Sequence, residues 1–404
     1  MRTKIIIFLL VTSSLVSIKP SSANNIDFQK TIDSHNLIGL SQVQKDGWDG
    51  TGQTIVVIDD GNSIDHPYLS GVFVDGNCTS RTVCGSDYLK PGIKSGGAHK
   101  GNGAHGSMVS GIIAGQKNAS APGGIAPKAK IISIDNTDGG SEGLIAAMEW
   151  VLTIRKKYNV VAVSGSIGAP NFSEFRGGEG NCSLDPTLSV KIKELVNAGV
   201  VMIFAAGNGG SYVKLDYPAC LSEVVSVGAL TSKGSIADYS NISKSITVLA
   251  PAEIISSNGD GGYFIGSGTS SATPVVAGAV ALLKQAKPDA TPQEIKSALQ
   301  STRSRISDVL WANLPILNLP IAIEAIQTGK FELQPITPIG NATPTPAPTV
   351  TLTPSPAPTV TVTATPQPTP AKTIVLKQIT CFKGKLIKKI TAVKPVCPAG
   401  YKKK

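Results

Sequence analysis

Residues 54–61 read Thr-Ile-Val-Val-Ile-Asp-Asp-Gly, a short β-branched run that ends in two carboxylates and a glycine. An unbroken apolar run of this length is typical of a parallel strand that is buried on both faces. Four further runs of the same kind follow along the chain, at 130–134, 160–163, 200–205 and 224–227. The sequence therefore predicts a buried, mostly parallel sheet whose first strand covers residues 54–58.

Helix-like patterns separate these predicted strands. Their expected ranges are 106–114, 143–158, 186–198, 274–285 and 292–300. Alternation of strands and helices predicts an α/β fold, in which a doubly wound, mostly parallel sheet carries helices on both faces. In such sheets ligands bind beyond the carboxyl ends of the strands. Asp59 and Asp60 follow the first predicted strand and are therefore expected at that edge.

The two ends of the chain differ in composition from its centre. Residues 1–23 are expected to be a secretory signal peptide, because Arg2 and Lys4 precede an apolar stretch and a small-residue cleavage site follows. An uncleaved membrane anchor is disfavoured, since the apolar run is short and interrupted by serines. The other expected parts are a lead-in at 24–47, a main domain at 48–328, a Pro/Thr-rich linker at 329–371 and a Lys-rich unit with two cysteines at 372–404.

The net charge of +10 is concentrated in the last part of the chain. Residues 372–404 contain ten lysines and no Asp, Glu or Arg, so the remainder is close to neutral. Such a unit at the end of a linker is expected to dock on an anionic cell-surface polymer or an acidic membrane surface. A solvated tail is the alternative. Nucleic acid is not an expected partner, because the unit has no arginine and little aromatic surface for stacking.

Six cysteines occur as three near pairs, without the spacing of metal ligands. Export permits disulfides, and the expected bridges are sequential: Cys78–Cys84, Cys182–Cys220 and Cys381–Cys397. The second bridge closes a long loop and is expected to add about 3–4 kcal/mol to stability on the chain-entropy model.

Two helix starts carry candidate catalytic groups. Ser270 lies in Gly-Ser-Gly-Thr-Ser-Ser-Ala-Thr-Pro, residues 266–274, just ahead of an apolar helix. Unpaired backbone N–H groups and the positive end of the helix dipole suit a nucleophile whose attack creates an oxyanion. His105 begins another small-residue helix and is the best placed of the four histidines for a base, with a packing histidine as the alternative. The strand alone does not decide whether Asp59 or Asp60 orients an imidazole and which one makes a turn.

Two further candidate segments follow predicted strands. Asn208, in Ala-Ala-Gly-Asn-Gly-Gly at 205–210, can point its amide into a cleft where negative charge develops. A simple Asn-Gly turn is the alternative. Ser166, Ile167 and Gly168 follow another strand, where the glycine lets an extended peptide approach and pair; a strand-ending turn is the alternative here.

Together, in the chain order Asp, His, Ser, these segments resemble the subtilisin-like serine proteases, the subtilase family. The matching stretches are 57–69, 103–111, 205–210 and 267–278. The resemblance covers about residues 48–328. It selects Asp59 over Asp60 as the family's aspartate, and Ser270 over Ser267 and Ser271 as its serine.

The resemblance implies a secreted serine endopeptidase. Ser270 would attack the peptide carbonyl, His105 would transfer the proton, and Asp59 would hold the imidazole. Asn208 and the Ser270 backbone N–H would stabilise the oxyanion, and residues 166–168 would bind the extended substrate. A catalytically inactive surface-binding protein on the same scaffold is the alternative. An esterase is disfavoured, because no Gly-x-Ser-x-Gly pattern surrounds Ser270.

The resemblance also implies polypeptide substrates and a broad or apolar preference beside the cleaved bond, since no lone acidic residue in the matched segments marks a pocket for a basic side chain. No metal or other cofactor is required for this chemistry. Structural Ca²⁺ is common in the family, but no ligand positions match here, so no metal-binding residue is assigned. The protein is expected to be a monomer located outside the cell or at its surface.

Two positions depart from the family's usual pattern. Met108 stands where the segment after the catalytic histidine usually carries a second histidine, and Ser271 stands where methionine is common. Both positions flank the reactive residues, so we expect altered packing rather than lost chemistry.

Overall fold

The computed structural model describes residues 27–84, 103–168, 182, 185–302, 304–338, 377–383, 386–392 and 402–403. The chain divides into two units, residues 1–343 and 344–404, which are described separately. The predicted signal peptide, most of the predicted linker and the predicted Cys381–Cys397 bridge lie outside the described residues. The domain boundaries stay predictions.

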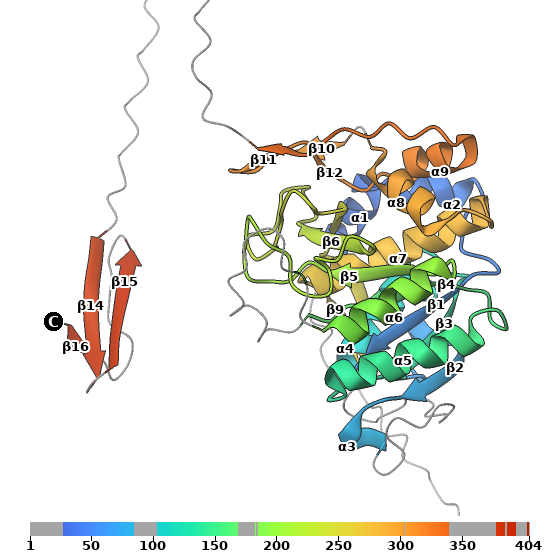
Figure 1. The fold of residues 1–404 in the computed structure, drawn as a ribbon, viewed down its shortest axis with the longest axis horizontal. Helices are drawn as coiled ribbons and strands as arrows, with labels where there is room; N and C mark the ends of the chain where they lie inside the picture. The colour runs from blue at the N-terminus through green and yellow to red at the C-terminus, as the bar shows by residue number, and fades with distance from the viewer. Residues whose placement is uncertain are drawn as a thin grey trace, which may run out of the picture. The chain divides into compact units, whose positions relative to one another are not determined.

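A seven-stranded sheet runs through the first unit in the order β2-β3-β1-β4-β5-β6-β7 (Figure 1). All its pairings are parallel. Its strands are β1 (Thr54–Asp59), β2 (Phe73–Cys78), β3 (Lys130–Asp135), β4 (Val160–Gly165), β5 (Val201–Ala205), β6 (Val225–Leu230) and β7 (Val248–Pro251). The five predicted strands are confirmed. β2 and β7 have no predicted counterpart, because they are the edge strands: β2 is only partly buried and β7 has four residues.

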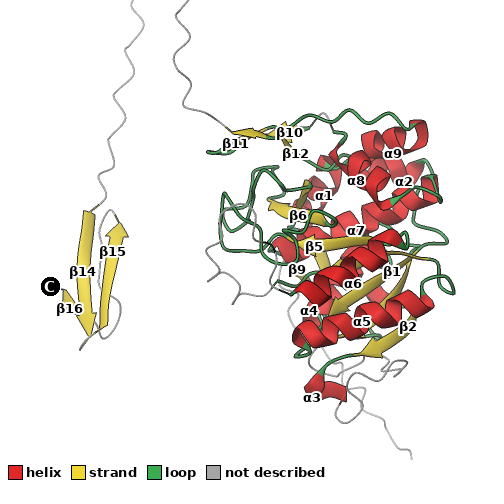
Figure 2. Ribbon diagram, viewed as in Figure 1, coloured by secondary structure: helices red, strands yellow, loops and turns green. Residues whose placement is uncertain are grey.

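Helices cover both faces of this sheet, as Figure 2 shows. One face carries α4 (Ala104–Ala114), α7 (Thr269–Ala286), α8 (Pro292–Gln300) and α9 (Leu319–Thr328), and the other carries α5 (Gly140–Ile154) and α6 (Pro186–Asn197). Strand β1 shows why helices are needed on both faces. Ile55 and Val57 pack with the first set of helices, whereas Val56 and Ile58 pack with the second, because successive strand residues point to opposite faces. The doubly wound α/β prediction is confirmed.

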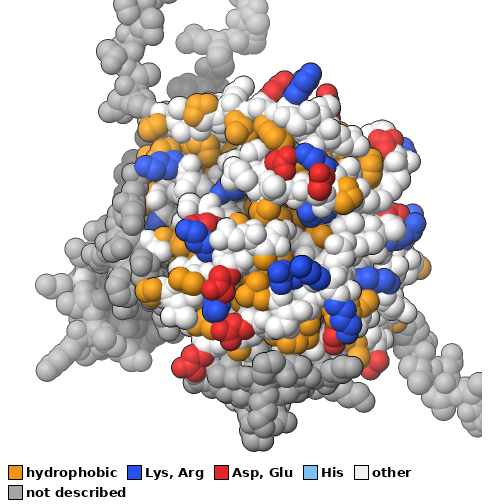
Figure 3. All heavy atoms as spheres, turned by 45° about the vertical axis from the view of Figure 1, so that its right-hand side comes forward, with side chains coloured by type: hydrophobic (Ala, Val, Ile, Leu, Met, Phe, Trp, Pro, Cys, Tyr) orange, Lys and Arg blue, Asp and Glu red, His pale blue; other side chains and the backbone are white. Residues whose placement is uncertain are grey.

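Shorter elements complete the first unit. They are η1 (Pro67–Leu69), α3 (Arg81–Cys84), and the strand pairs β8 (Ile255–Ser257) with β9 (Tyr263–Ile265), β10 (Arg305–Ile306) with β12 (Leu314–Pro315), and β11 (Trp311–Ala312) with β13 (Thr337–Pro338). Two predicted disulfides, Cys78–Cys84 and Cys182–Cys220, are present. None of the described helices is long and apolar enough to cross a membrane. On the face shown in Figure 3, acidic and basic side chains are interspersed, in keeping with a nearly neutral first unit.

The second unit contains a three-stranded antiparallel sheet with strand order β15-β14-β16. Its strands are β14 (Lys377–Lys383), β15 (Leu386–Ala392) and β16 (Lys402–Lys403). The Lys-rich segment therefore forms a small β unit.

The lead-in folds as two helices, α1 (Phe28–Leu37) and α2 (Leu40–Lys45). Leu40 and Val43 of α2 belong to the main hydrophobic core. The Ser34 hydroxyl of α1 donates to the backbone carbonyl of Glu253 at 3.0 Å, and Lys30 forms an ion pair with the Glu253 carboxylate. The lead-in is therefore held against the body of the first unit by apolar and polar contacts.

His35 makes the stability of this contact dependent on pH. The side chain is buried in α1, where burial lowers its pKa from 6.5 to about 4. The unfolded chain gains a proton at His35 below about pH 6.5, but the folded chain does so only below about pH 4. Stability is therefore complete above pH 6.5 and falls as the pH drops through this window, by up to about 3 kcal/mol.

A His35→Leu variant tests this expectation by urea unfolding at pH 7 and at pH 4.5. The variant cannot take up the proton, so it should gain stability relative to the wild type as the pH falls. A difference in unfolding free energy that is the same at both pH values would contradict the assignment.

Candidate active site

Asp59 ends β1 at the carboxyl edge of the sheet. The residue is 5% exposed, and Oδ1 accepts a hydrogen bond from the backbone N–H of Asp60 at 2.9 Å. The same oxygen lies 2.7 Å from Nδ1 of His105. Because an ionised carboxylate can only accept, this bond places a proton on Nδ1 and leaves Nε2 of the neutral ring able to accept one.

Asp60 has a different role from its neighbour. Its Oδ1 accepts from the backbone N–H of Gly106 at 2.7 Å, and its Oδ2 lies 3.4 Å from the backbone nitrogen of His105. Asp60 thus binds the first turn of α4, while Asp59 binds the His105 ring. Gly106 permits this approach, because a Cβ atom there would lie 1.9 Å from the carbonyl oxygen of Gly61.

The close carboxylates shift the pKa values of the site. Burial raises the pKa of Asp60 to about 6, and the charge of Asp59 adds to this effect. Burial lowers the pKa of His105, but its hydrogen bond to Asp59 and the charges of both carboxylates outweigh burial, so the pKa of His105 lies above its ordinary value of 6.5. The protonated form of the His105 ring is therefore more stable in this site than it is for a histidine in water.

Ser270 lies in the first turn of α7, which begins at Thr269. The prediction that this helix starts at residue 274 is wrong by five residues. Proline is common at the first position of helices, but Pro274 lies inside α7. Proline has no N–H, so the carbonyl of Ser270 lacks its donor four residues later and instead accepts from the Ser166 hydroxyl at 2.8 Å.

Replacement of Ser166 by alanine should destabilise the protein by about 1–2 kcal/mol, because it leaves the partly buried Ser270 carbonyl without the Ser166 donor. Ser164→Ala is the matched control, because Ser164 lies in β4, two residues before Ser166. Ser164 is also buried, but its hydroxyl has no hydrogen-bond partner among the described residues. Its removal should therefore lower the free energy of unfolding only slightly. Equal losses of unfolding free energy in urea would contradict this role of Ser166.

Asn208 follows β5 and lies beside the start of α7. Its Oδ1 accepts from the backbone N–H of Thr269 at 2.8 Å and from the Thr269 hydroxyl at 2.9 Å. The amide oxygen is therefore engaged with the helix start. The hydrogen bonds between described residues do not use its Nδ2 group, which can donate into the adjoining cavity that Asn208 lines.

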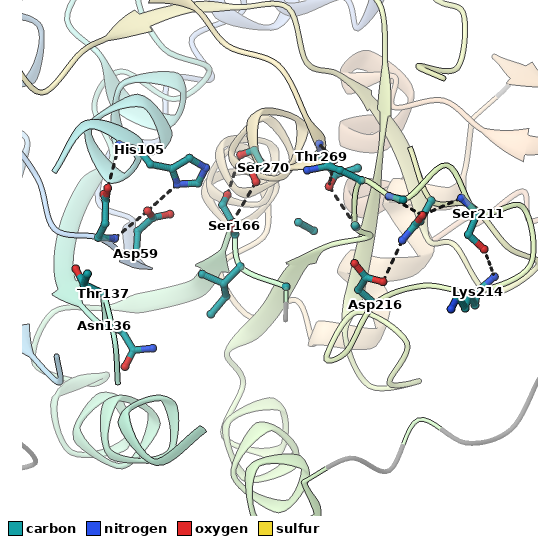
Figure 4. A pocket seen from close by; sticks show the side chains of 18 residues that line it. Asp59, His105, Asn136, Thr137, Ser166, Ser211, Lys214, Asp216, Thr269 and Ser270 are labelled. Atoms are coloured by element: carbon teal, nitrogen blue, oxygen red, sulfur yellow. Dashed lines mark hydrogen bonds and ion pairs between the residues drawn. The ribbon is translucent and has the colours of Figure 1, made fainter. Parts of the chain in front are cut away.

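A cavity of about 700 Å³ brings these groups together at the carboxyl edge of the sheet (Figure 4). All seven predicted site residues line it: Asp59, His105, Ser166, Ile167, Gly168, Asn208 and Ser270. The Ser270 hydroxyl donates to the carbonyl of Ser166 at 3.3 Å. The hydrogen bonds of the described residues include none between Ser270 and His105.

The cavity also contains polar residues that sequence reasoning missed. Asn136, Thr137, Ser211, Lys214, Asp216 and Asn241 contribute to its lining. All six come from loops whose placement depends on the whole fold.

The two departures from the family pattern lie in contact with each other. Met108 and Ser271 are both buried, and the Ser271 hydroxyl lies 3.3 Å from the Met108 sulfur. The same hydroxyl donates to the carbonyl of Ser267 at 2.9 Å. A histidine and a methionine in the usual pattern are thus replaced here by a methionine and a serine that contact each other.

No cluster of three or more His, Cys, Asp or Glu side chains suited to a metal ion occurs within the part of the chain that the structure describes. Structural Ca²⁺ stays an untested expectation.

The first unit of this chain resembles known proteins. Residues 50–319 match the model of the subtilase family. Subtilisin NAT of Bacillus subtilis subsp. natto is 27% identical over 299 residues, which cover 71% of this chain and 71% of that protein. An intracellular serine protease of Paenibacillus polymyxa is 32% identical over 248 residues, which cover 58% of this chain and 68% of that protein.

A solved structure gives the same result for the fold. A cold adapted subtilisin-like serine proteinase is 26% identical, has a TM-score of 0.52, and covers 67% of this chain and 89% of its own. The chain therefore belongs to the subtilase family and is a serine-type endopeptidase.

Proposed function

We propose that the protein is exported and cleaves polypeptides with Asp59, His105 and Ser270 as its catalytic triad. The 2.7 Å bond between Asp59 and His105, beside Ser270 in one cavity, is the observation that carries this proposal. The two disulfides within the described residues and the predicted signal peptide support export.

The reaction begins when the Ser270 hydroxyl turns from the Ser166 carbonyl towards His105. Neutral His105 takes the hydroxyl proton at Nε2 while Ser270 Oγ bonds to the substrate carbonyl carbon. The imidazolium then gives this proton to the leaving amine, and the acyl-enzyme remains. A water molecule gives a proton to His105 and attacks the acyl carbon, and the imidazolium then returns that proton to Ser270 Oγ as the bond to the acyl group breaks and the carboxylic acid product leaves. Asp59 stays ionised throughout and stabilises the imidazolium.

The tetrahedral oxyanion binds between the Nδ2 group of Asn208 and the backbone N–H of Ser270. The engaged amide oxygen of Asn208 supports this role, because it fixes the amide before the charge develops. Residues 166–168 continue from β4 along the cavity and offer backbone groups to an extended substrate, in the manner of an added strand.

Labelling with a fluorophosphonate tests the proposal directly, since this reagent reacts with an activated serine. The wild type should be labelled and Ser270→Ala should not. Ser267→Ala is the control, because Ser267 is an exposed serine of the same turn. An unlabelled but folded wild type that cleaves no peptide would favour the inactive surface-binding protein instead.

We also propose that the C-terminal unit docks on an anionic cell-surface polymer. The strands of its sheet carry lysines at positions 377, 383, 388, 389, 402 and 403. No acidic residue occurs anywhere in 372–404. Such a density of positive charge attracts a polyanion, and salt weakens the attraction.

Fractionation of the producing cells tests this docking, with the full chain compared to a chain that ends at residue 371. The full chain should remain with the cell-surface fraction at low salt and be released at high salt, whereas the shortened chain should be free. The same distribution for both would contradict docking. Binding to vesicles of acidic lipid, but not to purified wall polymer, would assign a membrane surface instead.

A further inference from the structure

A carboxylate lies against both chain segments that flank Ser270. Asp216 is partly buried and lines the same cavity. A Cβ atom on Gly207, which precedes Asn208, would lie 2.0 Å from Oδ2 of Asp216. A Cβ atom on Gly168 would lie 3.7 Å from the same oxygen. The two glycines therefore leave the cavity open to this carboxylate, with no side chain in front of it from either segment.

A buried amide holds Asp216 in this position. The Nδ2 group of Asn241 donates to Oδ1 of Asp216 at 3.1 Å and to the carbonyl of Ala206 at 3.1 Å. The Oδ1 of Asn241 accepts from the backbone N–H groups of Gly209 and Ser211. Asn241 is 1% exposed. The hydrogen bonds of the described residues leave Oδ2 of Asp216 without a donor, on the side that faces the two glycines.

Partial burial gives the Asp216 carboxylate a reason to pair with a cation. Burial raises the pKa of Asp216 above its ordinary value, although the charge of Lys214 and the hydrogen bond from Asn241 act in the opposite direction. In Figure 4, Asp216 lies between Ser270 and Lys214. A cation that enters the cavity can pair with the Asp216 carboxylate and so replace the water that the carboxylate has lost.

We propose that Asp216 makes the enzyme prefer lysine or arginine immediately before the cleaved bond. The inference rests on the proposed function, which places the substrate carbonyl between Ser270 and Asn208. The side chain on the acyl side of that carbonyl enters the cavity between the segments of Gly168 and Gly207. There it ends at Asp216, where an ammonium or guanidinium group pairs with the carboxylate. This preference replaces the broad or apolar one that the family resemblance implied.

Peptide amides that differ only in the residue before the cleaved bond test the inference, with Lys, Arg, Leu and Glu at that position. The wild type should have a kcat/KM for Lys and Arg at least about tenfold above that for Leu. Asp216→Asn should lower the Lys-to-Leu ratio by about 10–100-fold, because it removes a charge-assisted hydrogen bond. Asp216→Lys should turn the preference towards Glu.

Asp238→Asn is the matched control, because it removes an exposed carboxylate from outside the lining of this cavity. Its Lys-to-Leu ratio should equal that of the wild type. A wild type that cleaves the Leu peptide as well as the Lys peptide would overturn the inference and leave the protease proposal intact, and this result does not depend on any variant folding. Failure to cleave any of the peptides would instead refute the proposed function.

Discussion

Replacement of Ser270 by alanine should abolish peptide hydrolysis while the protein stays folded. The expected fall in kcat is about 10⁶-fold, the scale known from removal of the nucleophile in subtilisins. Folding should survive, because the Ser270 hydroxyl makes only a 3.3 Å bond to the carbonyl of Ser166. The shorter bond from the Ser166 hydroxyl to the Ser270 carbonyl does not involve the side chain that is removed. Hydrolysis of a peptide amide and thermal unfolding measure the two effects.

Ser271→Ala serves as the control for this prediction. Ser271 is adjacent and fully buried, and its hydroxyl contacts Met108 and the carbonyl of Ser267. Its loss should reduce stability by about 1 kcal/mol, with a far smaller effect on kcat. A comparable loss of activity in both variants would mean that the turn as a whole, rather than one hydroxyl, supports the reaction.

The sheet could be predicted from the sequence because buried parallel strands have a simple signature. Each central strand is a continuous apolar run, as in Val56 to Ile58, and both of its faces are buried. The edge strand β2 reads Phe-Val-Asp-Gly-Asn-Cys and lacks this signature, because half of it faces solvent. The start of α7 was missed for a different reason: the donor that compensates for Pro274 is Ser166, more than 100 residues away in the chain.

The candidate site shows the same division between local and long-range information. Asp59, His105, Asn208 and Ser270 each stand near a helix start or a strand end, so local patterns made them candidates, and the family resemblance then selected them from their neighbours. Asp216 could not be found in this way. Its closeness to Gly168 and Gly207 depends on how three loops pack at the sheet edge.

Asp59→Asn should lower kcat by about 10⁴-fold. In the wild type, the Asp59 carboxylate can only accept the hydrogen from Nδ1 of His105, so Nε2 is free to take the proton of Ser270. An asparagine amide can donate to Nδ1 instead, which moves the ring proton to Nε2 and removes the base. The charge of Asp59 also raises the pKa of His105, so this variant should lose part of that rise.

The pH dependence of kcat/KM makes this prediction specific. Activity needs neutral His105, so the wild-type rate should rise with pH through a midpoint above 6.5. In Asp59→Asn the residual activity should show a lower midpoint. Asp60→Asn is the decisive comparison, because Asp60 binds the backbone of α4 rather than the ring. Its asparagine oxygen can still accept from Gly106, so the loss of kcat should be far smaller. A larger loss in Asp60→Asn than in Asp59→Asn would exchange the roles of the two carboxylates.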